Sequence, residues 1–255
     1  MSRVITSSRI PSSRFERTAG FGGLALKLGL NLAKSATKDI GRGQVPSLRS
    51  MMLSPNNFED IANSLAHMRG AAMKLGQLMS MDDTDLLPPE FVAILARLRA
   101  SGYAMPPKQL RLVLNKNWGL DWRKKFSSFD ARPFAAASIG QVHKGVLRDG
   151  RKVAIKVQFP HIKKSIKSDV NNLRLMARFS GILPKELDFE HYLEICQEQL
   201  VAETNYSREA KYLQTFDDLA QSETCIVVPN VVADFSTPEI LMMSFEEGYE
   251  FDTMD

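Results

Sequence analysis

Apolar residues recur at three- and four-residue steps through the front third of the chain. The clearest run covers residues 58–79 and predicts an amphipathic helix with Asn57 as its N-cap. Two further helices are expected, one over residues 89–100 and one that starts at Pro107 and ends before Gly119. Both begin with proline, which suits the first helical position because the N–H of that residue has no partner inside the helix. The front third is therefore predicted to be helical.

The rest of the chain predicts a small sheet with helices between its strands. Residues 138–147 and 152–159 are β-leaning runs joined by Arg148-Asp149-Gly150-Arg151, and Asp-Gly between two such runs is a strong hairpin signal. The other expected elements are helices over residues 162–179 and 189–219, and strands over residues 126–130, 231–235 and 240–245. About five strands, with helices between the third and the fourth, fit an α+β domain with an antiparallel sheet, in the order of a protein-kinase N-terminal lobe.

Composition and cysteine usage are those of a globular protein in a reducing compartment. The chain has 255 residues, of which 44% are hydrophobic and 24% charged, so it can form one large domain or two modest ones. Its two cysteines, Cys196 and Cys225, lie far apart and form no CxxC pair, which argues against a disulfide framework or a zinc cluster. The four histidines show no HExxH or paired spacing, so metal binding through histidine is not expected.

Positive charge is concentrated at the front of the chain. Residues 1–50 carry nine lysines and arginines against two acids, a local balance of +7, while the remaining residues sum to −3. No stretch reaches the roughly 18 uncharged apolar residues of a membrane-spanning helix, and no secretory signal is found. For residues 20–35 two interpretations stay open: a helix lying on an anionic membrane surface, or a loosely docked terminus. Nucleic-acid binding is not expected, because the basic residues are not interleaved with aromatic ones.

The second arm of the predicted hairpin contains the tetrapeptide Val153-Ala154-Ile155-Lys156. In kinases such a strand directs its lysine at the α- and β-phosphates of the nucleotide. A lysine on a buried strand needs an acidic partner, whereas a lysine on the solvent face of an edge strand does not. One strand earlier, where a kinase has its glycine-rich loop, the sequence reads Ala135-Ala136-Ala137-Ser138-Ile139-Gly140. Alanine keeps the N–H donors but restricts φ, so a stiffer loop is expected.

These motifs resemble those of the UbiB/ADCK family of atypical kinases, which is linked to ubiquinone biosynthesis and has an alanine-rich nucleotide loop as its hallmark. The resemblance covers about residues 45–255. Two more segments carry it: Lys74-Leu75-Gly76-Gln77 matches the KxGQ motif of the family, and Glu203-Thr204-Asn205, followed by Glu209, matches its ExD segment. Asn205 stands where the family has its second acid and brings no negative charge to a metal ion, so no metal ligand is assigned in this segment.

The resemblance implies an adenine-nucleotide site and a regulatory cluster. Lys156 would hold the phosphates, Glu209 would pair with it from an αC-type helix, and ATP or ADP with Mg²⁺ would be the cofactor. The other residues implied for the nucleotide belong to the loop and the hinge: Ala135, Ala136, Ala137, Ser138, Phe245, Glu246 and Glu247. The residues implied for regulation belong to the KxGQ and ExD segments: Lys74, Gln77, Glu203 and Asn205. In the family the KxGQ helix lies over the active site, with the first ExD acid near its lysine.

Two features that a complete kinase needs are not found in this sequence. They are the catalytic loop with its Asp and Asn, and the Asp-Phe-Gly segment that supplies the main Mg²⁺ ligand; the chain ends at Asp255, just past the expected hinge. We therefore expect a catalytically incomplete chain that lacks the C-lobe. Its expected parts are a basic segment over residues 1–45, a helical KxGQ extension packed on the lobe over residues 46–120, and a kinase-like N-lobe over residues 121–255.

Two functions stay open from the sequence. The first is an atypical kinase or ATPase that supports ubiquinone biosynthesis and binds adenine nucleotide. The second is a non-catalytic module that binds a lipid, an anionic membrane surface or a protein of the ubiquinone-synthesis machinery. For either function, the expected location is the cytoplasm at the periphery of the inner membrane in a bacterium, or the mitochondrial matrix in a eukaryote.

Overall fold

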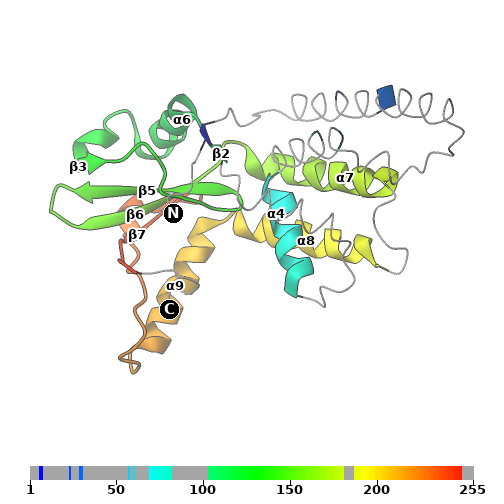
Figure 1. The fold of residues 1–255 in the computed structure, drawn as a ribbon. Helices are drawn as coiled ribbons and strands as arrows, with labels where there is room; N and C mark the ends of the chain where they lie inside the picture. Colours follow the sequence, from blue (N-terminus) through cyan, green and yellow to red (C-terminus); the bar gives the residue numbers. More distant parts are fainter. Residues whose placement is uncertain are drawn as a thin grey trace, which may run out of the picture. The chain divides into compact units, whose positions relative to one another are not determined.

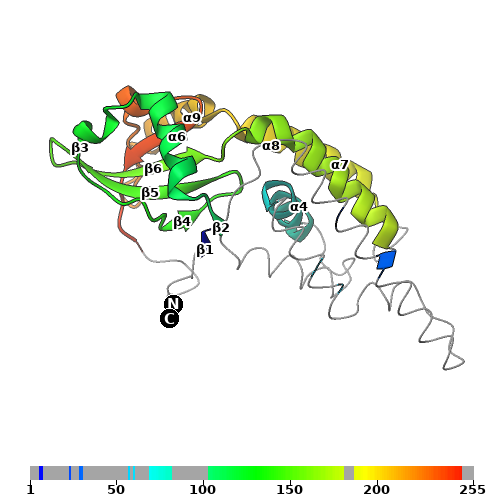
Figure 2. The same ribbon diagram turned by 90° about the horizontal axis from the view of Figure 1, so that it is seen from above.

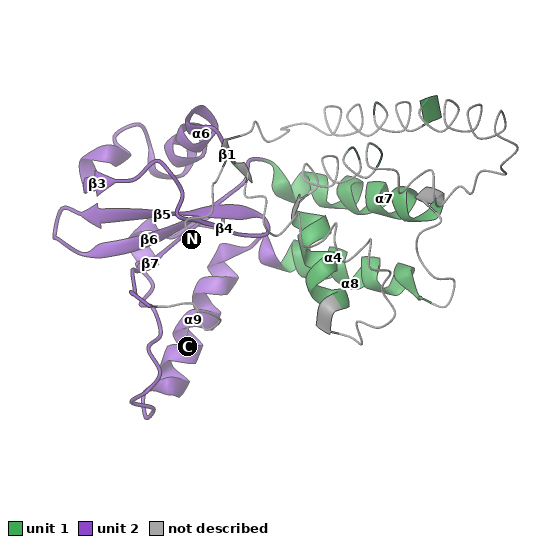
Figure 3. Cartoon of the chain, in the orientation of Figure 1, with its two compact units in different colours: residues 1–104, 161–202 green, residues 105–160, 203–255 purple. Residues whose placement is uncertain are grey.

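The computed structural model describes residues 6–7, 23, 29–30, 57, 60, 69–81, 103–180 and 187–248. The chain forms two compact units, shown in Figure 3: unit 1 comprises residues 1–104 and 161–202, and unit 2 comprises residues 105–160 and 203–255. Most of the helical segment that follows the second hairpin strand therefore groups with the front of the chain, while the sheet belongs to unit 2. The division at residues 45 and 120 stays a prediction.

Three helices form most of the described part of unit 1: α4 (Arg69–Met81), α7 (Ile162–Ser180) and α8 (Phe189–Glu203), the last up to residue 202. α4 packs against α7, and the two helices lie side by side in Figures 1 and 2. Cys196 of α8 places its Sγ 3.5 Å from the carbonyl oxygen of Ala71 on α4. Each helix buries a stripe of apolar residues at helical spacing, such as Ile162, Ile166 and Val170 of α7.

Two further contacts hold unit 1 together. The short strand β1 (Thr6–Ser7) pairs in parallel with β2 (Tyr103–Ala104). Glu190 of α8 accepts a hydrogen bond from Arg174 of α7 at 2.7 Å, and this bond lowers the pKa of the Glu190 carboxyl below its ordinary value. None of the helices in the described ranges is both long and apolar enough to cross a bilayer.

Unit 2 is built on a five-stranded antiparallel sheet. Its strands are β3 (Phe126–Phe129), β4 (Ala135–Ala136), β5 (Gly140–Leu147), β6 (Lys152–Gln158) and β7 (Ile240–Ser244). The order across the sheet is β3-β5-β6-β7, and β4 also pairs with β5. β5 and β6 form the predicted hairpin, in which Gly150 has a φ of 90° and the N–H of Leu147 donates to the carbonyl oxygen of Arg151. The predicted α+β architecture with an antiparallel sheet is confirmed.

The two faces of this sheet have different covers, as Figure 1 shows. α6 (Pro107–Trp118) lies on one side of the sheet and α9 (Tyr206–Ala220) on the other. Side chains alternate along a strand, so neighbouring residues of β6 point to opposite faces. Lys156 points toward α9, where it meets Glu209, and the fully buried Ile155 points toward α6. The α6 face therefore contains the apolar core, and the α9 face carries the charged lysine.

An aromatic cluster fills the α6 face. The ring centroid of Trp118 lies 5.6 Å from that of Phe126, 6.0 Å from that of Phe235 and 6.1 Å from that of Trp122. The indole N–H of Trp118 donates to the carbonyl oxygen of Phe235 at 2.8 Å. This bond holds the short 3-10 helix η3 (Ala233–Phe235) against α6, because it satisfies a half-buried carbonyl as well as the indole. Ring packing and polar satisfaction thus position the end of α6 next to β7.

One predicted strand is wrong. Residues 231–235 form no strand: Val231 makes a single bridge with Met243, and the chain then turns into η3. Ser236 accounts for the difference, because its Oγ accepts a hydrogen bond from the N–H of Met242 at 3.1 Å. This side-chain hydrogen bond takes the place of a backbone bond that a further strand would form with β7. The fifth strand is instead β4, inside the alanine-rich segment.

The single helix predicted over residues 189–219 is also wrong, because two helices occupy this stretch. α8 ends at Glu203 and α9 starts at Tyr206, with Asn205 between them as the N-cap of α9. The helix predicted from Pro107 is confirmed as α6, and the helix predicted over residues 162–179 is confirmed as α7. α4 covers the end of the run predicted over residues 58–79, while the rest of that run and the helix predicted over residues 89–100 lie largely or wholly outside the described residues.

Candidate functional site

Lys156 lies at the centre of the candidate site, on the α9 face of β6. The strand register places it opposite Val142 of β5 and Leu241 of β7. Its Nζ is 2.5 Å from Oε1 of Glu209, in the first turn of α9. The lysine side chain is 22% exposed and the glutamate side chain 39%, so the ion pair is neither sealed in the core nor fully solvated. An anion can therefore reach the ammonium group without unpacking the sheet.

Tyr206, the first residue of α9, supplies the surface next to this pair. The Lys156 ammonium lies 4.8 Å from the centroid of the Tyr206 ring, in a cation–π arrangement. The tyrosine is fully buried, and burial, together with the charges of Glu209 and Glu203, raises the pKa of its phenol well above the ordinary value. Its hydroxyl has no hydrogen-bond partner among the described residues. Tyr206 and Glu209 are three residues apart, so one turn of α9 presents both to the lysine.

The alanine-rich loop forms a tight hairpin. β4 pairs with the start of β5, and the N–H of Ala137 donates to the carbonyl oxygen of Gly140 at 3.0 Å. No residue of this loop has a positive φ, as expected of a loop built from alanine. Gly140 itself is required for a close approach, since a Cβ there would collide with the carbonyl oxygen of Val157 and lie 2.9 Å from Oη of Tyr206. The loop is therefore fixed at its base and has one of its N–H donors already in use.

Hydrogen bonds tie the tip of the loop and the junction of α8 and α9 to their surroundings. Ser138 Oγ donates to Oε2 of Glu203 at 2.7 Å. Gln158, at the end of β6, donates from Nε2 to the carbonyl oxygens of Thr204 and Pro238, both at 2.9 Å. Hydrogen bonds to an ionised acceptor are the stronger kind, so the Ser138 contact restrains the loop most directly. Glu203 and Thr204, just before α9, thus accept hydrogen bonds from the loop and from β6, respectively.

The segment expected to be the hinge follows β7. The N–H of Phe245 donates to the carbonyl oxygen of Lys152 at 3.1 Å, which extends the pairing with β6 beyond the end of the strand. The Phe245 ring meets the Phe134 ring edge-on with centroids 5.7 Å apart, and the Lys144 ammonium lies 4.2 Å from the Phe245 centroid. These contacts join the base of the alanine-rich loop to the hinge across the α9 face of the sheet.

The two glutamates of the hinge are exposed. Ser244 Oγ donates to Glu246 at 2.5 Å, and Lys152 forms an ion pair with Glu247 at 3.3 Å. No backbone hydrogen bond of either glutamate is found within the described residues.

Comparison with known proteins gives the family of this chain. Residues 97–255 match the ABC1 atypical kinase-like domain. The chain belongs to the ABC1 atypical kinase-like family. This assignment agrees with the UbiB/ADCK resemblance of its motifs.

Several curated relatives of this ABC1-family chain are mitochondrial proteins by name. The chain is 39% identical over 247 residues to atypical kinase COQ8, mitochondrial, of Saccharomyces cerevisiae. This alignment covers 97% of this chain and 49% of that protein. It is 41% identical to atypical kinase COQ8B, mitochondrial, of Rattus norvegicus, over 96% of this chain and 47% of that protein. The chain spans about half the length of these relatives. The solved complex of Rv3197 with erythromycin from Mycobacterium tuberculosis aligns with 92% of this chain and 52% of its own, at 25% identity and a TM-score of 0.44.

The residues of the predicted regulatory cluster fall in different units of the ABC1-family chain. Lys74 and Gln77 lie on α4 in unit 1, three residues apart, with Lys74 half-buried and Gln77 exposed. Glu203 belongs to unit 2, where it accepts the hydrogen bond from Ser138. The grouping of Lys74 with Glu203 stays a prediction.

Asn205 has a structural role that the sequence pattern did not indicate. Its side chain accepts a hydrogen bond from the N–H of Arg208 at 3.4 Å and so caps α9, the helix that carries Glu209. Among the described residues no group of three or more His, Cys, Asp or Glu side chains is placed to hold a metal ion.

His143 is a buried polar residue that sequence reasoning missed. Its Nδ1 lies 2.9 Å from the carbonyl oxygen of Asp130, and its Nε2 lies 2.8 Å from Nε2 of Gln141. Gln141 Oε1 accepts a hydrogen bond from the N–H of Met105 at 2.8 Å, so its amide group donates to the histidine. Burial lowers the pKa of His143 from 6.5 to about 4, against a smaller opposing effect of Asp130. The neutral ring, with its proton on Nδ1, satisfies this whole chain of bonds. The sequence signal for this burial was the two-residue alternation of side chains along β5, which places Gln141 and His143 on the same face as the buried Ile155.

Proposed function

We propose that this chain is the nucleotide-binding part of a UbiB/ADCK-type atypical kinase or ATPase that supports ubiquinone biosynthesis. The observation that carries the proposal is the ion pair of Lys156 and Glu209 beside the buried Tyr206, whose hydroxyl lies next to Gly140 at the end of the alanine-rich loop. The same lysine, strand and helix occur in the nucleotide site of protein kinases. The names of the mitochondrial COQ8 relatives support the biosynthetic role. Because this chain spans about half the length of these relatives, the activity of the whole protein is also part of the proposal.

Each side chain of the site has a defined part in this proposal. Lys156 would bind the α- and β-phosphates of ATP or ADP, while Glu209 and Tyr206 keep its ammonium in place. The hinge segment, with the backbone of Glu246 and Glu247, would receive the adenine. Ser138 would hold the loop over the phosphates through its bond to Glu203. Mg²⁺, when bound, would neutralise phosphate charge, and its ligands are expected beyond the described residues.

The test is equilibrium binding of a fluorescent ADP derivative to the 255-residue chain. Lys156→Met removes the ammonium and is expected to weaken binding at least about tenfold, because a hydrogen bond to a charged group contributes about 1.5–3 kcal/mol. Lys211→Met is the matched control, since Lys211 is an exposed lysine on α9, two residues beyond Glu209. It is expected to bind like the wild type. Equal affinities of the Lys156→Met variant and the wild type would overturn the proposed site.

The charge of the first fifty residues favours a second function, association with an anionic membrane surface. Residues 1–50 have a local balance of +7, and each basic residue near such a surface contributes about 1 kcal/mol at physiological salt. Such binding would place the protein at the periphery of a membrane, with or without a partner from the ubiquinone-synthesis machinery. Co-sedimentation with anionic vesicles, with and without residues 1–45 and at low and high salt, tests it. Binding that persists without residues 1–45 would contradict this assignment.

A further inference from the structure

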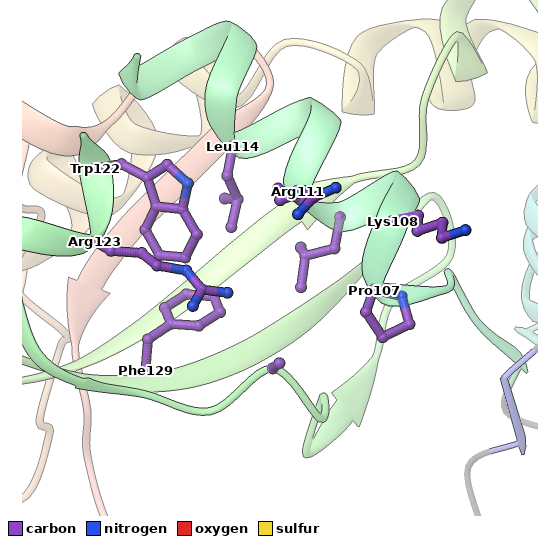
Figure 4. A pocket seen from close by; sticks show the side chains of 9 residues that line it. Pro107, Lys108, Arg111, Leu114, Trp122, Arg123 and Phe129 are labelled. Atoms are coloured by element: carbon purple, nitrogen blue, oxygen red, sulfur yellow. The ribbon is translucent and has the colours of Figure 1, made fainter. Parts of the chain in front are cut away.

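A small cavity lies in unit 2 between α6, the 3-10 helix η2 (Trp122–Lys125) and β3. Its volume is about 210 Å³, and Figure 4 shows the side chains that line it. It opens on the α6 side of the sheet, whereas Lys156 points to the α9 side. The cavity is therefore separate from the candidate nucleotide site.

The floor of the cavity is apolar and partly aromatic. It is formed by Leu110 and Leu114 of α6, by Trp122 and by Phe129 of β3. The rings of Trp122 and Phe129 meet edge-on, with centroids 4.9 Å apart, so they give the cavity a rigid aromatic corner. The indole N–H of Trp122 is already bonded to Asn115, which fixes the ring in this position. Such a corner fits a ligand with a flat apolar group.

As far as the chain is described, the rim of the cavity carries three cations and no acid. Lys108 and Arg111 project from α6, and Arg123 from η2, all of them exposed. Arg123 also lies over the Trp122 ring, 5.4 Å from its centroid. Neither Lys108 nor Arg111 has a carboxylate partner among the described residues.

Two other cations near the cavity have carboxylate partners. Lys116, further along α6, forms an ion pair with Glu239 at 2.6 Å, and Lys124 pairs with Asp121 at 2.9 Å. Within the described ranges, the three rim cations have no carboxylate partner, whereas Lys116 and Lys124 each have one. The first turn of α6 adds to the positive potential, because the N-cap Pro106 provides no side-chain hydrogen bond and the helix dipole is positive at that end.

We propose that this cavity binds a small aromatic anion, a single ring that carries one carboxylate or phosphate. The ring would rest against Trp122 and Phe129, and the anionic group would be held by Arg111 and Arg123, whose planar guanidinium groups suit both head groups. The volume sets the size, since it lies below the roughly 300–1,000 Å³ of sites for drug-sized ligands. The site is independent of adenine-nucleotide binding.

The experiment is a titration of the 255-residue chain with phenyl phosphate, followed by the indole N–H signals of its two tryptophans in NMR spectra. Benzoate is titrated in parallel to compare the head groups. Benzyl alcohol supplies the ring without the charge, and inorganic phosphate supplies the charge without the ring. We expect saturable shifts of the Trp122 signal with phenyl phosphate or benzoate, and affinities at least about tenfold weaker for the two partial ligands.

Three variants locate the site. Arg111→Gln and Arg123→Gln are each expected to weaken aromatic-anion binding about tenfold, through loss of a charge-assisted contact. Arg208→Gln removes an exposed arginine of α9, on the opposite side of the sheet from the cavity, and is expected to bind like the wild type. Because these are surface positions, each variant is expected to fold. The chemical-shift dispersion of the indole signals checks this. Shifts as large with benzyl alcohol as with phenyl phosphate, equal binding of inorganic phosphate, no saturable shift, or unchanged affinity in both cavity variants would overturn the proposal.

Discussion

The ammonium of Lys156 lies 4.8 Å from the ring centroid of Tyr206 while it pairs with Glu209. The tyrosine and the glutamate come from the same first turn of α9, so the placement of that helix controls the placement of the lysine. The tyrosine is fully buried, and its hydroxyl also lies against Gly140 at the start of β5. One side chain thus connects the lysine, the loop and the helix.

The ring of Tyr206, and not its hydroxyl, is expected to contribute the stability. Tyr206→Phe removes a buried hydroxyl that has no partner among the described residues, so the free energy of unfolding should stay within about 1 kcal/mol of the wild type. Tyr206→Leu removes the ring and should lower it by about 2 kcal/mol or more. Urea denaturation of both variants measures the difference. A Phe variant as unstable as the Leu variant would show that the hydroxyl has an essential partner.

The bond from Ser138 to Glu203 is expected to restrain the alanine-rich loop. Ser138→Ala removes it and should speed amide exchange at Ala137 about fivefold, which corresponds to about 1 kcal/mol. Ser127→Ala is the control, because Ser127 Oγ also donates a hydrogen bond, to the carbonyl oxygen of Val146, but lies on β3 away from the loop. Hydrogen exchange followed by NMR measures both. Equal exchange rates at Ala137 in the two variants would mean that the loop is held by its backbone pairing alone.

Local signals allowed much of the fold to be predicted from the sequence. The Asp149-Gly150 turn fixed the β5–β6 hairpin, and Pro107 marked the start of α6, because both depend on backbone preferences of the residues themselves. Lys156 was identified through the strand that carries it, and its assignment to Glu209 came from the family resemblance. The ion pair in the structure joins these two residues.

The features that sequence reasoning missed depend on contacts between distant residues. The break between α8 and α9 is held by Gln158, which donates to the carbonyl oxygen of Thr204, and by the N–H of Tyr206, which donates to the carbonyl oxygen of Pro238. The helical pattern of residues 189–219 continues through that break and gave no sign of it. The lost strand at residues 231–235 depends on Ser236, whose bond to Met242 no local pattern reveals.

The cap formed by Asn205 is expected to need an acceptor side chain but not an amide. Asn205→Ala should lower the free energy of unfolding by about 1 kcal/mol, the usual cost of a lost N-cap. Asn205→Asp should retain wild-type stability, because aspartate accepts the same bond from Arg208 and its charge suits the positive end of α9. Chemical denaturation at pH 7 compares the three proteins. An equal loss in the Asp and Ala variants would contradict the capping role.

His143 is expected to make the protein less stable in mild acid. Its folded pKa of about 4 lies below the ordinary value of 6.5, so the unfolded chain binds more protons between these values. Stability should therefore fall as the pH falls, by about 2 kcal/mol from this residue between pH 7.5 and pH 5.

Two histidine variants isolate this effect in unfolding measurements at both pH values. His143→Asn removes the titrating group and should reduce the difference between pH 7.5 and pH 5 by about 2 kcal/mol. His191→Asn, at an exposed position of α8, should keep the wild-type difference. The same pH dependence in the wild type and in His143→Asn would show that His143 is not the source.

The measurement that tests the account most directly is a double-mutant cycle on Lys156 and Glu209, with ADP affinity as the readout. Lys156→Met and Glu209→Gln should each weaken binding at least about tenfold. The double variant should bind about as weakly as Lys156→Met alone, because Glu209 acts on the phosphates by holding the lysine. Losses that simply add, or an unchanged affinity in Glu209→Gln, would contradict a nucleotide site built on this ion pair.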